Sequence, residues 1–470
     1  MDGENLCWLS AAELAALIRR KKVSPVEVVK ATLERIDRVN PKVNAYVTIT
    51  AEHALGEAQA AERALMKKRT KLGLLHGVPF SVKDLVFTKG IPTTFGTPLL
   101  KDFVPAEDAP FVERLKGAGA IMIGKTNTPA FGWVGVTHNL LFGPTRNPWN
   151  LECTPGGSSG GASAAVAAGL GPLAIGTDGG GSIRIPASLA GIYGFKPSYG
   201  RIPMYPQAGA WSLSHLGPMT RTVEDAALMM QVGAGPDERD PYSLPETEID
   251  FLKSLRRGVR GMRIAFSDSL GFVKVLDPEV REICAKAARA FEELGGRVEM
   301  VNPGWPSPDP CWREIFCSGL ASRILPFRDR REEIEPGLYE MLEKSLKNPP
   351  MAYLQSWLDR LAWWQHPRAF FEKYDLLLTP TVACPAFPVG LEGPGNIDGQ
   401  PVDRYGWFPF TSPFNLTGQP AASIPCGFTK GGLPVGLQIV GRRYDDAAVL
   451  RASAAFEKVR PWARKKPPAV

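Results

Sequence analysis

The stretch Gly156-Gly-Ser-Ser-Gly-Gly161, followed by Thr177-Asp-Gly-Gly-Gly-Ser-Ile-Arg184, is the most informative part of this chain. Each stretch holds a serine in a glycine-rich turn, and these serines, Ser158 and Ser182, lie 24 positions apart. A lysine, Lys83, stands upstream in an apolar run. Hydroxyls held in tight turns, with a lysine that burial can keep neutral, are the components of a serine acyl-transfer site that needs no histidine.

Apolar runs and helix-start signals on both sides of these stretches indicate the fold class. Runs of strand length occupy 78–82, 121–124, 173–176, 263–266, 297–301, 376–378, 422–425 and 435–440. Helical patterns such as 109–117 and 161–169 separate the runs, and capping residues open helices at Ser10, Ser24 and Thr222. Strands that alternate with helices favour an α/β fold with a large mixed, mostly parallel β-sheet.

Composition excludes several classes of function. The chain has 470 residues, 44% of them hydrophobic and 22% charged, as in a folded protein with a large interior. Its formal charge of +7 is spread over short basic clusters, which argues against a nucleic-acid partner. Seven cysteines without a Cys-x-x-Cys pair indicate reduced thiols and neither disulfides nor a zinc site. With no apolar run near the ~18 residues of a membrane span and no secretory signal, we expect a cytoplasmic protein without membrane, metal or cofactor.

The chain is predicted to form a single domain over 1–470. Two segments of this domain differ from the rest in composition. The region 303–371 is rich in Trp, Pro, Arg and Glu, and we interpret it as a helical elaboration near the substrate pocket. A peripheral helical layer without a function is the alternative. The end of the chain, 460–470, is predicted to be a disordered tail.

The glycine-rich turns admit other interpretations when each is taken alone. Ser158 is central in a formal Gly-x-Ser-x-Gly match, which is typical of an α/β-hydrolase elbow. That site needs a later histidine, and only His215 and His366 follow, neither in a recognisable loop. A phosphate cradle is not favoured, because no Gly-Lys-Ser/Thr element or Gly-x-Gly-x-x-Gly opens a helix at these turns. Glycines 179–181 instead let successive N–H groups point at one spot and stabilise an oxyanion.

The combination resembles the amidase signature family over nearly the whole chain, apart from residues of about 300 to 370. The matching blocks are Gly77-Val-Pro-Phe-Ser-Val-Lys-Asp84, Gly124-Lys-Thr-Asn127, Gly143-Pro-Thr-Arg-Asn-Pro-Trp149, Pro155-Gly-Gly-Ser-Ser-Gly-Gly161, Gly176-Thr-Asp-Gly-Gly-Gly-Ser-Ile-Arg184, Gly194-Phe-Lys-Pro197, Gly217-Pro-Met-Thr-Arg-Thr222, Leu378-Thr-Pro-Thr381, Asn415-Leu-Thr-Gly-Gln-Pro420 and Gly432-Leu-Pro-Val-Gly-Leu-Gln438. A chance match of so many blocks is very improbable. The resemblance implies that family's α/β fold, with helices on both faces of the central sheet.

The resemblance also implies a Ser-cisSer-Lys triad. Ser182 would be the nucleophile, and Ser158, preceded by a strained or cis peptide bond, would shuttle the proton. Neutral Lys83 would be the base that receives this proton. A covalent acyl-enzyme on Ser182 would then be hydrolysed by water.

Further roles around the triad follow from the same resemblance. The N–H groups of Gly179, Gly180, Gly181 and Ser182 would form the oxyanion hole. Gly179 departs from the family pattern, because many members carry a larger residue there, often Thr. Asp178, Arg184 and Ser159 would be supporting residues: the first two would hold the loop, and Ser159 would hydrogen-bond near the triad or serve the structure alone.

The substrate is less well indicated. Apolar and aromatic residues of the chain suit a hydrophobic acyl or aryl group, and the pocket candidates are Phe131, Trp133, Trp407 and Phe408. The same side chains would equally serve as core. The chain is therefore interpreted as a stand-alone amide hydrolase for apolar or aromatic amides, with carbamates (urethanes) and esters as further small-molecule substrates. A glutamine-dependent amidotransferase subunit that supplies ammonia for tRNA amidation is the alternative, and a binding protein on an amidase scaffold is a third. A homodimer is expected from the resemblance alone.

Overall fold

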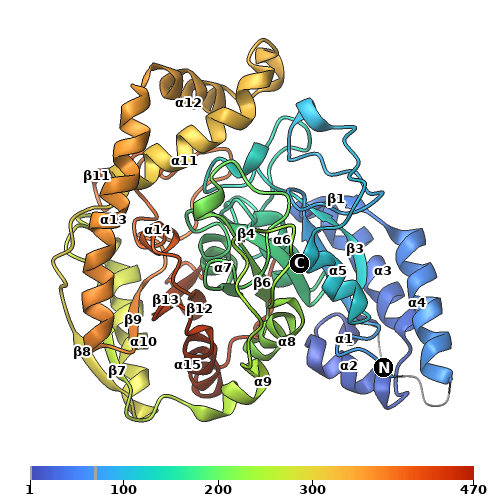
Figure 1. Ribbon diagram of the computed structural model, residues 1–470. Coiled ribbons are helices and arrows are strands. Elements are labelled where there is room, and N and C mark those ends of the chain that lie inside the picture. The colour runs from blue at the N-terminus through green and yellow to red at the C-terminus, as the bar shows by residue number, and fades with distance from the viewer. Residues whose placement is uncertain (1–2, 68–70) are drawn as a thin grey trace.

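The computed structural model describes residues 3–67 and 71–470. An eleven-stranded β-sheet forms the centre of this part of the chain (Figure 1). In order across the sheet the strands are β1 (Tyr46–Ile49), β3 (Ile121–Thr126), β2 (Pro79–Lys83), β4 (Leu173–Asp178), β6 (His215–Thr220), β5 (Tyr193–Lys196), β12 (Ala421–Phe428), β13 (Pro434–Gly441), β9 (Leu376–Pro380), β7 (Arg263–Phe266) and β8 (Arg297–Met300). All the runs predicted as strands lie in this sheet. The C-terminal strands β12 and β13 join its middle, so the two halves of the chain share one sheet.

The sheet is mixed, as predicted. Parallel ladders join β2 to β3 and β4, and join β7 to β8 and β9. The other neighbouring pairs among the described strands are antiparallel. Antiparallel pairs therefore outnumber parallel pairs in this sheet, whereas the sequence predicted the reverse. A reason lies in the connection 429–433 between β12 and β13, because so short a turn can join only antiparallel strands.

Three strands of this sheet, β1, β5 and β6, were not predicted. The central strand β6 contains Gly217 and Pro218, residues that usually argue against a strand. A Cβ at position 217 would lie 2.2 Å from the carbonyl oxygen of Phe195 on β5. Glycine is needed there because two backbones approach closely, which a propensity argument cannot detect.

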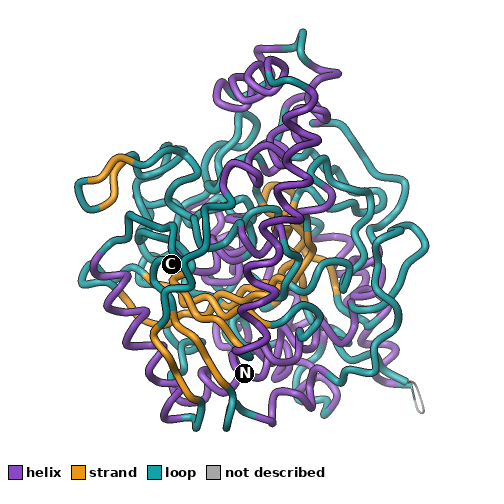
Figure 2. The backbone as a smooth tube through the Cα atoms, turned by 60° about the vertical axis from the view of Figure 1, so that its left-hand side comes forward, coloured by secondary structure: helices purple, strands orange, loops and turns teal. Residues whose placement is uncertain are grey.

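Helices cover the sheet on both sides (Figure 2). They are α1 (Gly3–Leu6), α2 (Ala11–Arg19), α3 (Pro25–Val43), α4 (Ala51–Met66), α5 (Pro110–Gly117), α6 (Gly160–Ala167), α7 (Arg184–Ala190), α8 (Val223–Gly233), α9 (Phe251–Ser254), α10 (Pro278–Glu293), α11 (Asp309–Ile324), α12 (Pro336–Lys347), α13 (Pro350–Lys373), α14 (Pro413–Leu416) and α15 (Asp446–Val459). A two-stranded sheet of β10 (Asn396–Ile397) and β11 (Gln400–Pro401) lies apart from them. The predicted caps are present: Ser10 and Ser24 form capping boxes, and the Thr222 hydroxyl accepts the N–H of Asp225.

Strand β4 shows how the pleat divides the core. Leu173 and Ile175 belong to the main apolar cluster, whereas Ala174 between them belongs to a separate cluster with Ala162 and Ala167 of α6 and the alanines of α7. Side chains alternate across a strand, so these clusters lie on opposite faces of the sheet. All of α6 is buried, and its small residues allow it to pack closely on the strands.

The segment 303–371 contains α11, α12 and nearly all of α13, and these helices stand together beside the sheet (Figure 1). The helix α11 packs against both α12 and α13. Trp312 on α11 and Trp363 on α13 are buried. No helix within the described ranges is long and apolar enough to cross a bilayer.

The tail 460–470, for which the sequence predicts disorder, contacts the rest of the chain in this structure. Trp462 is buried, and its indole N–H donates to the carbonyl of Arg221 at 2.8 Å. The Lys466 ammonium lies 4.8 Å from the centre of the Trp8 ring. A single large aromatic side chain with a satisfied N–H anchors a segment whose proline and lysine content suggests disorder.

We expect Trp462→Ala to lower the free energy of unfolding by about 3–5 kcal/mol, because it empties a buried indole site. Urea unfolding followed by tryptophan fluorescence measures this change. Arg464→Ala, at an exposed position of the same tail, is the control and should change stability by less than about 0.5 kcal/mol. An unchanged urea midpoint in Trp462→Ala would contradict the anchoring of the tail by Trp462 and support the prediction of a disordered tail.

Candidate active site

Lys83 ends β2, and every residue of that strand is buried. Its side chain is fully buried, and its Nζ lies 2.6 Å from Ser158 Oγ, 3.0 Å from Ser159 Oγ and 2.8 Å from Thr177 Oγ1. An ammonium group would donate to all three oxygens, whereas a neutral amine can accept the hydroxyl proton of one and donate to the others. The structure therefore brings Lys83 and Ser158 together in the geometry of a base and a hydroxyl.

Burial lowers the pKa of Lys83 well below its usual value, because the charged form is deprived of water. The carboxylate of Asp178 opposes this effect and raises the pKa. Desolvation is the larger of the two causes, so the site favours an uncharged amine.

The two serine turns are tied together beside this lysine. The peptide bond between Gly157 and Ser158 is cis, as the resemblance implies. The N–H of Ser159 donates to the carbonyl of Ser182 at 3.2 Å. The Ser159 hydroxyl donates to the carbonyl of Thr177 at 3.1 Å and accepts the Thr177 N–H at 3.2 Å. Ser159 thus joins the first turn to the end of β4.

Thr177 was not among the predicted site residues, although its hydroxyl contacts Lys83. The only signal was its place in the quoted stretch, directly before Asp178. The side chains of β4 alternate, and this places Thr177 and Asp178 on different faces.

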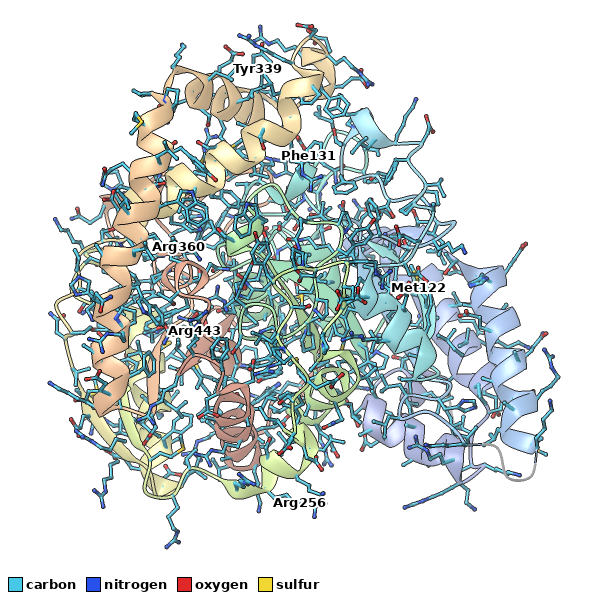
Figure 3. All side chains as sticks on the ribbon, in the orientation of Figure 1. Met122, Phe131, Arg256, Tyr339, Arg360 and Arg443 are labelled. Carbon is cyan, nitrogen blue, oxygen red and sulfur yellow. The ribbon has the colours of Figure 1, made fainter. Side chains whose placement is uncertain are left out.

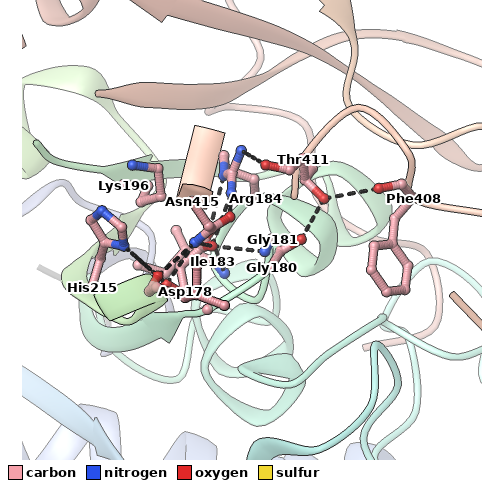
Figure 4. Close-up of polar contacts among 12 residues, drawn as sticks. Asp178, Gly180, Gly181, Ile183, Arg184, Lys196, His215, Phe408, Thr411 and Asn415 are labelled. Atoms are coloured by element: carbon pink, nitrogen blue, oxygen red, sulfur yellow. Dashed lines mark hydrogen bonds and ion pairs between the residues drawn. The ribbon is translucent and has the colours of Figure 1, made fainter. Parts of the chain in front are cut away.

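Asp178 and Arg184 form a fully buried ion pair inside the second turn (Figure 4). The Arg184 guanidinium donates twice, from Nε to Oδ2 at 3.0 Å and from Nη2 to Oδ1 at 2.9 Å. The same carboxylate accepts the N–H of Gly181 at 2.7 Å and of Ile183 at 3.2 Å. These bonds hold the backbone on both sides of Ser182.

The C-terminal part of the chain completes this network (Figure 4). Arg184 also donates to the carbonyl of Thr411 and to the side-chain oxygens of Asn415 and Gln438. The Asn415 amide donates to Asp178 Oδ1 at 2.9 Å. Burial alone would raise the pKa of Asp178, but the charge and hydrogen bonds of Arg184, together with the charge of Lys196 and the Asn415 amide, outweigh it and hold that pKa below its usual range.

The predicted oxyanion turn has its peptide groups held from outside. The carbonyl of Gly179 accepts the indole N–H of Trp312 at 3.0 Å, and that of Gly180 accepts the Thr411 hydroxyl at 2.6 Å. The Gly181 N–H is already engaged by Asp178, which removes it from the predicted set of four donors. The N–H groups of Gly179, Gly180 and Ser182 have no acceptor within residues 3–67 and 71–470.

An open cavity adjoins Ser158, Thr177, Gly179 and Ser182, and its empty space, counted together with the open solvent at its mouth, is about 830 Å³. Most of its remaining wall is apolar, and it includes Leu85, Val86, Phe95, Phe131, Met204, Tyr205, Leu216, Phe316 and Leu320. Arg323 is the one charged side chain among the described residues of this wall. Ser182 is less buried than Ser158, and it lines this cavity.

The structure separates the four predicted pocket residues. Phe131 lines the main cavity and lies below the helices α11 and α12 (Figure 3). Trp133 and Phe408 line a second, narrow cavity that also reaches Ser182. Trp407 lines neither of these two cavities, is fully buried, and donates its indole N–H to the carbonyl of Arg404 at 3.1 Å. For Trp407 the core alternative is correct.

Several wall residues were missed because they come from segments without a family pattern. Phe316, Leu320 and Arg323 lie on α11, and 204–210 forms a loop on another side of the cavity. The spacing of Phe316, Leu320 and Arg323 is helical, yet only the packing of α11 shows which face meets the cavity. Within the described chain, no cluster of three or more His, Cys, Asp or Glu side chains is arranged to hold a metal ion.

The lowered pKa of Lys83 has a measurable consequence for stability. Unfolded lysine binds a proton below about pH 10.4, whereas folded Lys83 stays neutral down to its lowered pKa, so stability rises with pH between these limits. We expect the stability of the native chain relative to Lys83→Met to increase by up to about 1.4 kcal/mol per pH unit in this window.

Urea unfolding of both proteins at about pH 7 and pH 9 measures the difference. A difference that does not change with pH would mean that Lys83 is charged in the folded protein.

Comparison with known proteins agrees with this geometry. The family model Amidase matches residues 27–450. An acylamidase of Rhodococcus erythropolis is 43% identical over 473 residues, covering 99% of this chain and 98% of that protein. A glutamyl-tRNA(Gln) amidotransferase subunit from Moorella thermoacetica is 39% identical over 98% of this chain and 99% of its own. The crystal structure of a bacterial aryl acylamidase of the amidase signature family superposes with a TM-score of 0.91 at 38% identity, covering 97% of both chains.

These matches extend over nearly the whole length of the chain and of each relative, and they include the segment 303–371, where no family pattern was recognised. They confirm the fold that the sequence motifs implied. The chain therefore belongs to the amidase signature family and is an amidase, a hydrolase of amide carbon–nitrogen bonds.

Proposed function

We propose that this amidase is a free-standing hydrolase of apolar and aromatic amides that works through Ser182, Ser158 and Lys83. The observation that carries the proposal is the 2.6 Å approach of a fully buried lysine amine to the Ser158 hydroxyl. A buried amine with a lowered pKa can accept a proton at neutral pH, which an ordinary lysine cannot.

The reaction has two halves. Ser182 Oγ attacks the amide carbonyl carbon, its proton passes to Ser158 Oγ, and Ser158 passes its own proton to Lys83 Nζ. The C–N bond then breaks, the leaving nitrogen takes the proton back through Ser158, and the acyl group remains on Ser182. A water molecule attacks this ester by the same route and releases the carboxylic acid.

Charge develops on the carbonyl oxygen in both halves. We assign its stabilisation to the N–H groups of Gly180 and Ser182, with Gly179 as a third donor, because the Gly181 N–H is bound to Asp178. Removing one such donor typically costs about 2.7–4 kcal/mol of transition-state stabilisation. The donors need no rearrangement during the reaction, since Asp178, Thr411 and the helix α7 already hold the turn.

The cavity supports an apolar substrate. Its wall is mostly hydrocarbon, and an aryl or alkyl group is stabilised there by loss of contact with water. The acylamidase and aryl acylamidase relatives support the same substrate class. Carbamates (urethanes) and esters present the same carbonyl carbon and are further candidate substrates.

A glutamine-dependent amidotransferase subunit is the second candidate, favoured by relatives of that name at 39% identity and below. Glutamine carries an ammonium and a carboxylate at its far end, and a pocket for it needs groups of both signs. The described cavity wall offers a guanidinium, Arg323, and no carboxylate. The cavity therefore favours the first candidate.

Two further proposals concern the location of the enzyme in the cell and its oligomeric state. We place it in the cytoplasm, a choice supported by seven cysteines that are all unbonded. The homodimer that the family resemblance implies is tested by the mass of the purified protein in solution.

We expect Ser182→Ala to abolish amine release from an anilide, an alkyl amide and an aryl carbamate, because it removes the nucleophile. Ser214→Ala is the control, since that hydroxyl lines the same cavity but donates to the carbonyl of Ala210. The purified single chain should release little ammonia from glutamine. Activity on glutamine alone, or only with partner subunits, would establish the amidotransferase.

The pH dependence tests Lys83. Protonated Lys83 cannot accept the Ser158 proton, so kcat/KM should rise as pH increases through the lowered pKa and level off well below pH 10. Lys83→Ala should lose about 10²–10⁴-fold in kcat/KM and lose this rise. Stopped or continuous anilide assays over pH 5–10 give both profiles. A variant with a native profile would refute Lys83 as the base.

A further inference from the structure

Trp312 contacts the oxyanion turn from a segment in which no family motif was recognised. It lies on α11, its side chain is almost fully buried, and its indole N–H donates to the carbonyl of Gly179 at 3.0 Å. The ring packs directly on the next residue: a Cβ at Gly180 would lie 2.3 Å from the Trp312 ring. Trp312 therefore determines both the space around this peptide group and the direction of its carbonyl.

The direction of that carbonyl determines the direction of the Gly180 N–H. A trans peptide group is planar, and its C=O and the following N–H point opposite ways. The bond from Trp312 to the Gly179 carbonyl thus turns the Gly180 N–H away from α11. The neighbouring peptide group behaves in the same way, because the Thr411 hydroxyl holds the Gly180 carbonyl and the Gly181 N–H points at Asp178.

The indole is itself held on several sides. It stacks on Phe316 with ring centres 4.8 Å apart and planes inclined by 17°. Tyr405 and Phe408 meet it edge to face, at 5.6 Å and 6.2 Å. Aromatic contacts of this kind leave a buried ring little freedom to rotate. Phe316 also lines the substrate cavity, one helical turn from Trp312.

We propose that Trp312 is a positioning residue for amide hydrolysis, whose indole N–H orients the Gly179–Gly180 peptide so that the Gly180 N–H meets the developing oxyanion. The proposal rests on the proposed function, because it requires the oxyanion hole at this turn. It gives the layer 303–371 a part in the chemical step as well as in the cavity wall. One helix, α11, carries both the orienting indole and the aromatic wall at Phe316.

The test compares two buried tryptophans of the same helical layer. Trp312→Phe removes the N–H that holds Gly179. Trp363→Phe removes an equivalent N–H, which donates to the carbonyl of Pro306 at 2.9 Å, away from the described walls of the cavities that reach Ser182. We expect kcat for an anilide to fall about tenfold in Trp312→Phe with KM within about threefold of the native value. In Trp363→Phe, kcat should stay within about twofold, while thermal unfolding shows similar losses in both variants.

A second measurement separates orientation from general structural damage. A boronic acid forms a tetrahedral anionic adduct with a reactive serine hydroxyl and so reports on the oxyanion donors. Its inhibition constant should rise in Trp312→Phe by about the factor by which kcat falls, and should not change in Trp363→Phe. If Trp312→Phe folds poorly, benzothienylalanine at position 312 keeps the fused ring and replaces the N–H by sulfur, and the same changes are expected.

Equal effects of the two Phe variants on kcat, or a loss of kcat without weaker boronate binding, would overturn the proposal. Ser182→Ala distinguishes a failure of the proposed function: activity retained in that variant would remove the oxyanion turn from the reaction and the role of Trp312 with it. Activity lost in Ser182→Ala but unaltered in Trp312→Phe would overturn only the role of Trp312.

Discussion

The buried ion pair of Asp178 and Arg184 is the interaction on which the rest of the site depends. The carboxylate holds the backbone on both sides of Ser182, and the guanidinium reaches Thr411, Asn415 and Gln438 from the C-terminal third of the chain. Burying two charges is costly, and the cost is offset here because nearly every donor and acceptor has a partner. Removal of either partner would leave an uncompensated charge in the middle of the sheet.

Around this pair, the site combines two opposite electrostatic demands. Asp178 must stay ionised in the interior, and Lys83 must stay neutral a short distance away. The guanidinium of Arg184 satisfies the carboxylate, whereas the three oxygens beside Lys83 belong to neutral serine and threonine side chains. Hydroxyl groups can donate to or accept from an uncharged amine, so burial outweighs the attraction of Asp178. The parts for chemistry come from 77–184, and much of the substrate wall comes from 204–210 and α11.

Much of the site was predictable because local sequence carries its requirements. Glycines in a close-packed turn, a serine between them and a lysine in a buried strand are each demanded by backbone geometry or chemistry at that position. Thr177 and Trp312 were not predicted as site residues, for a physical reason. A threonine next to an aspartate has an ordinary structural role in most proteins, and so does a tryptophan in a helix. The strand β6 was not predicted because its glycine, Gly217, is required by a contact with Phe195 on β5. These two residues lie 22 positions apart in the sequence, so no local pattern records the contact. Trp407 was misplaced because a buried aromatic residue has the same sequence signature in a core as in a pocket wall.

The sequence by itself determined the family, the mixed α/β class and the residue types of the proposed serine–lysine site, since these depend on short motifs whose chemistry is local. Only the tertiary structure decided the proportion of antiparallel strands, the anchoring of the tail through Trp462 and which aromatic side chains face the cavity. It also decided that Asp178 occupies the Gly181 N–H and that Trp312 holds the Gly179 carbonyl. Each of these depends on contacts between residues far apart in the chain, and a linear pattern does not record the direction in which a side chain or a peptide group points.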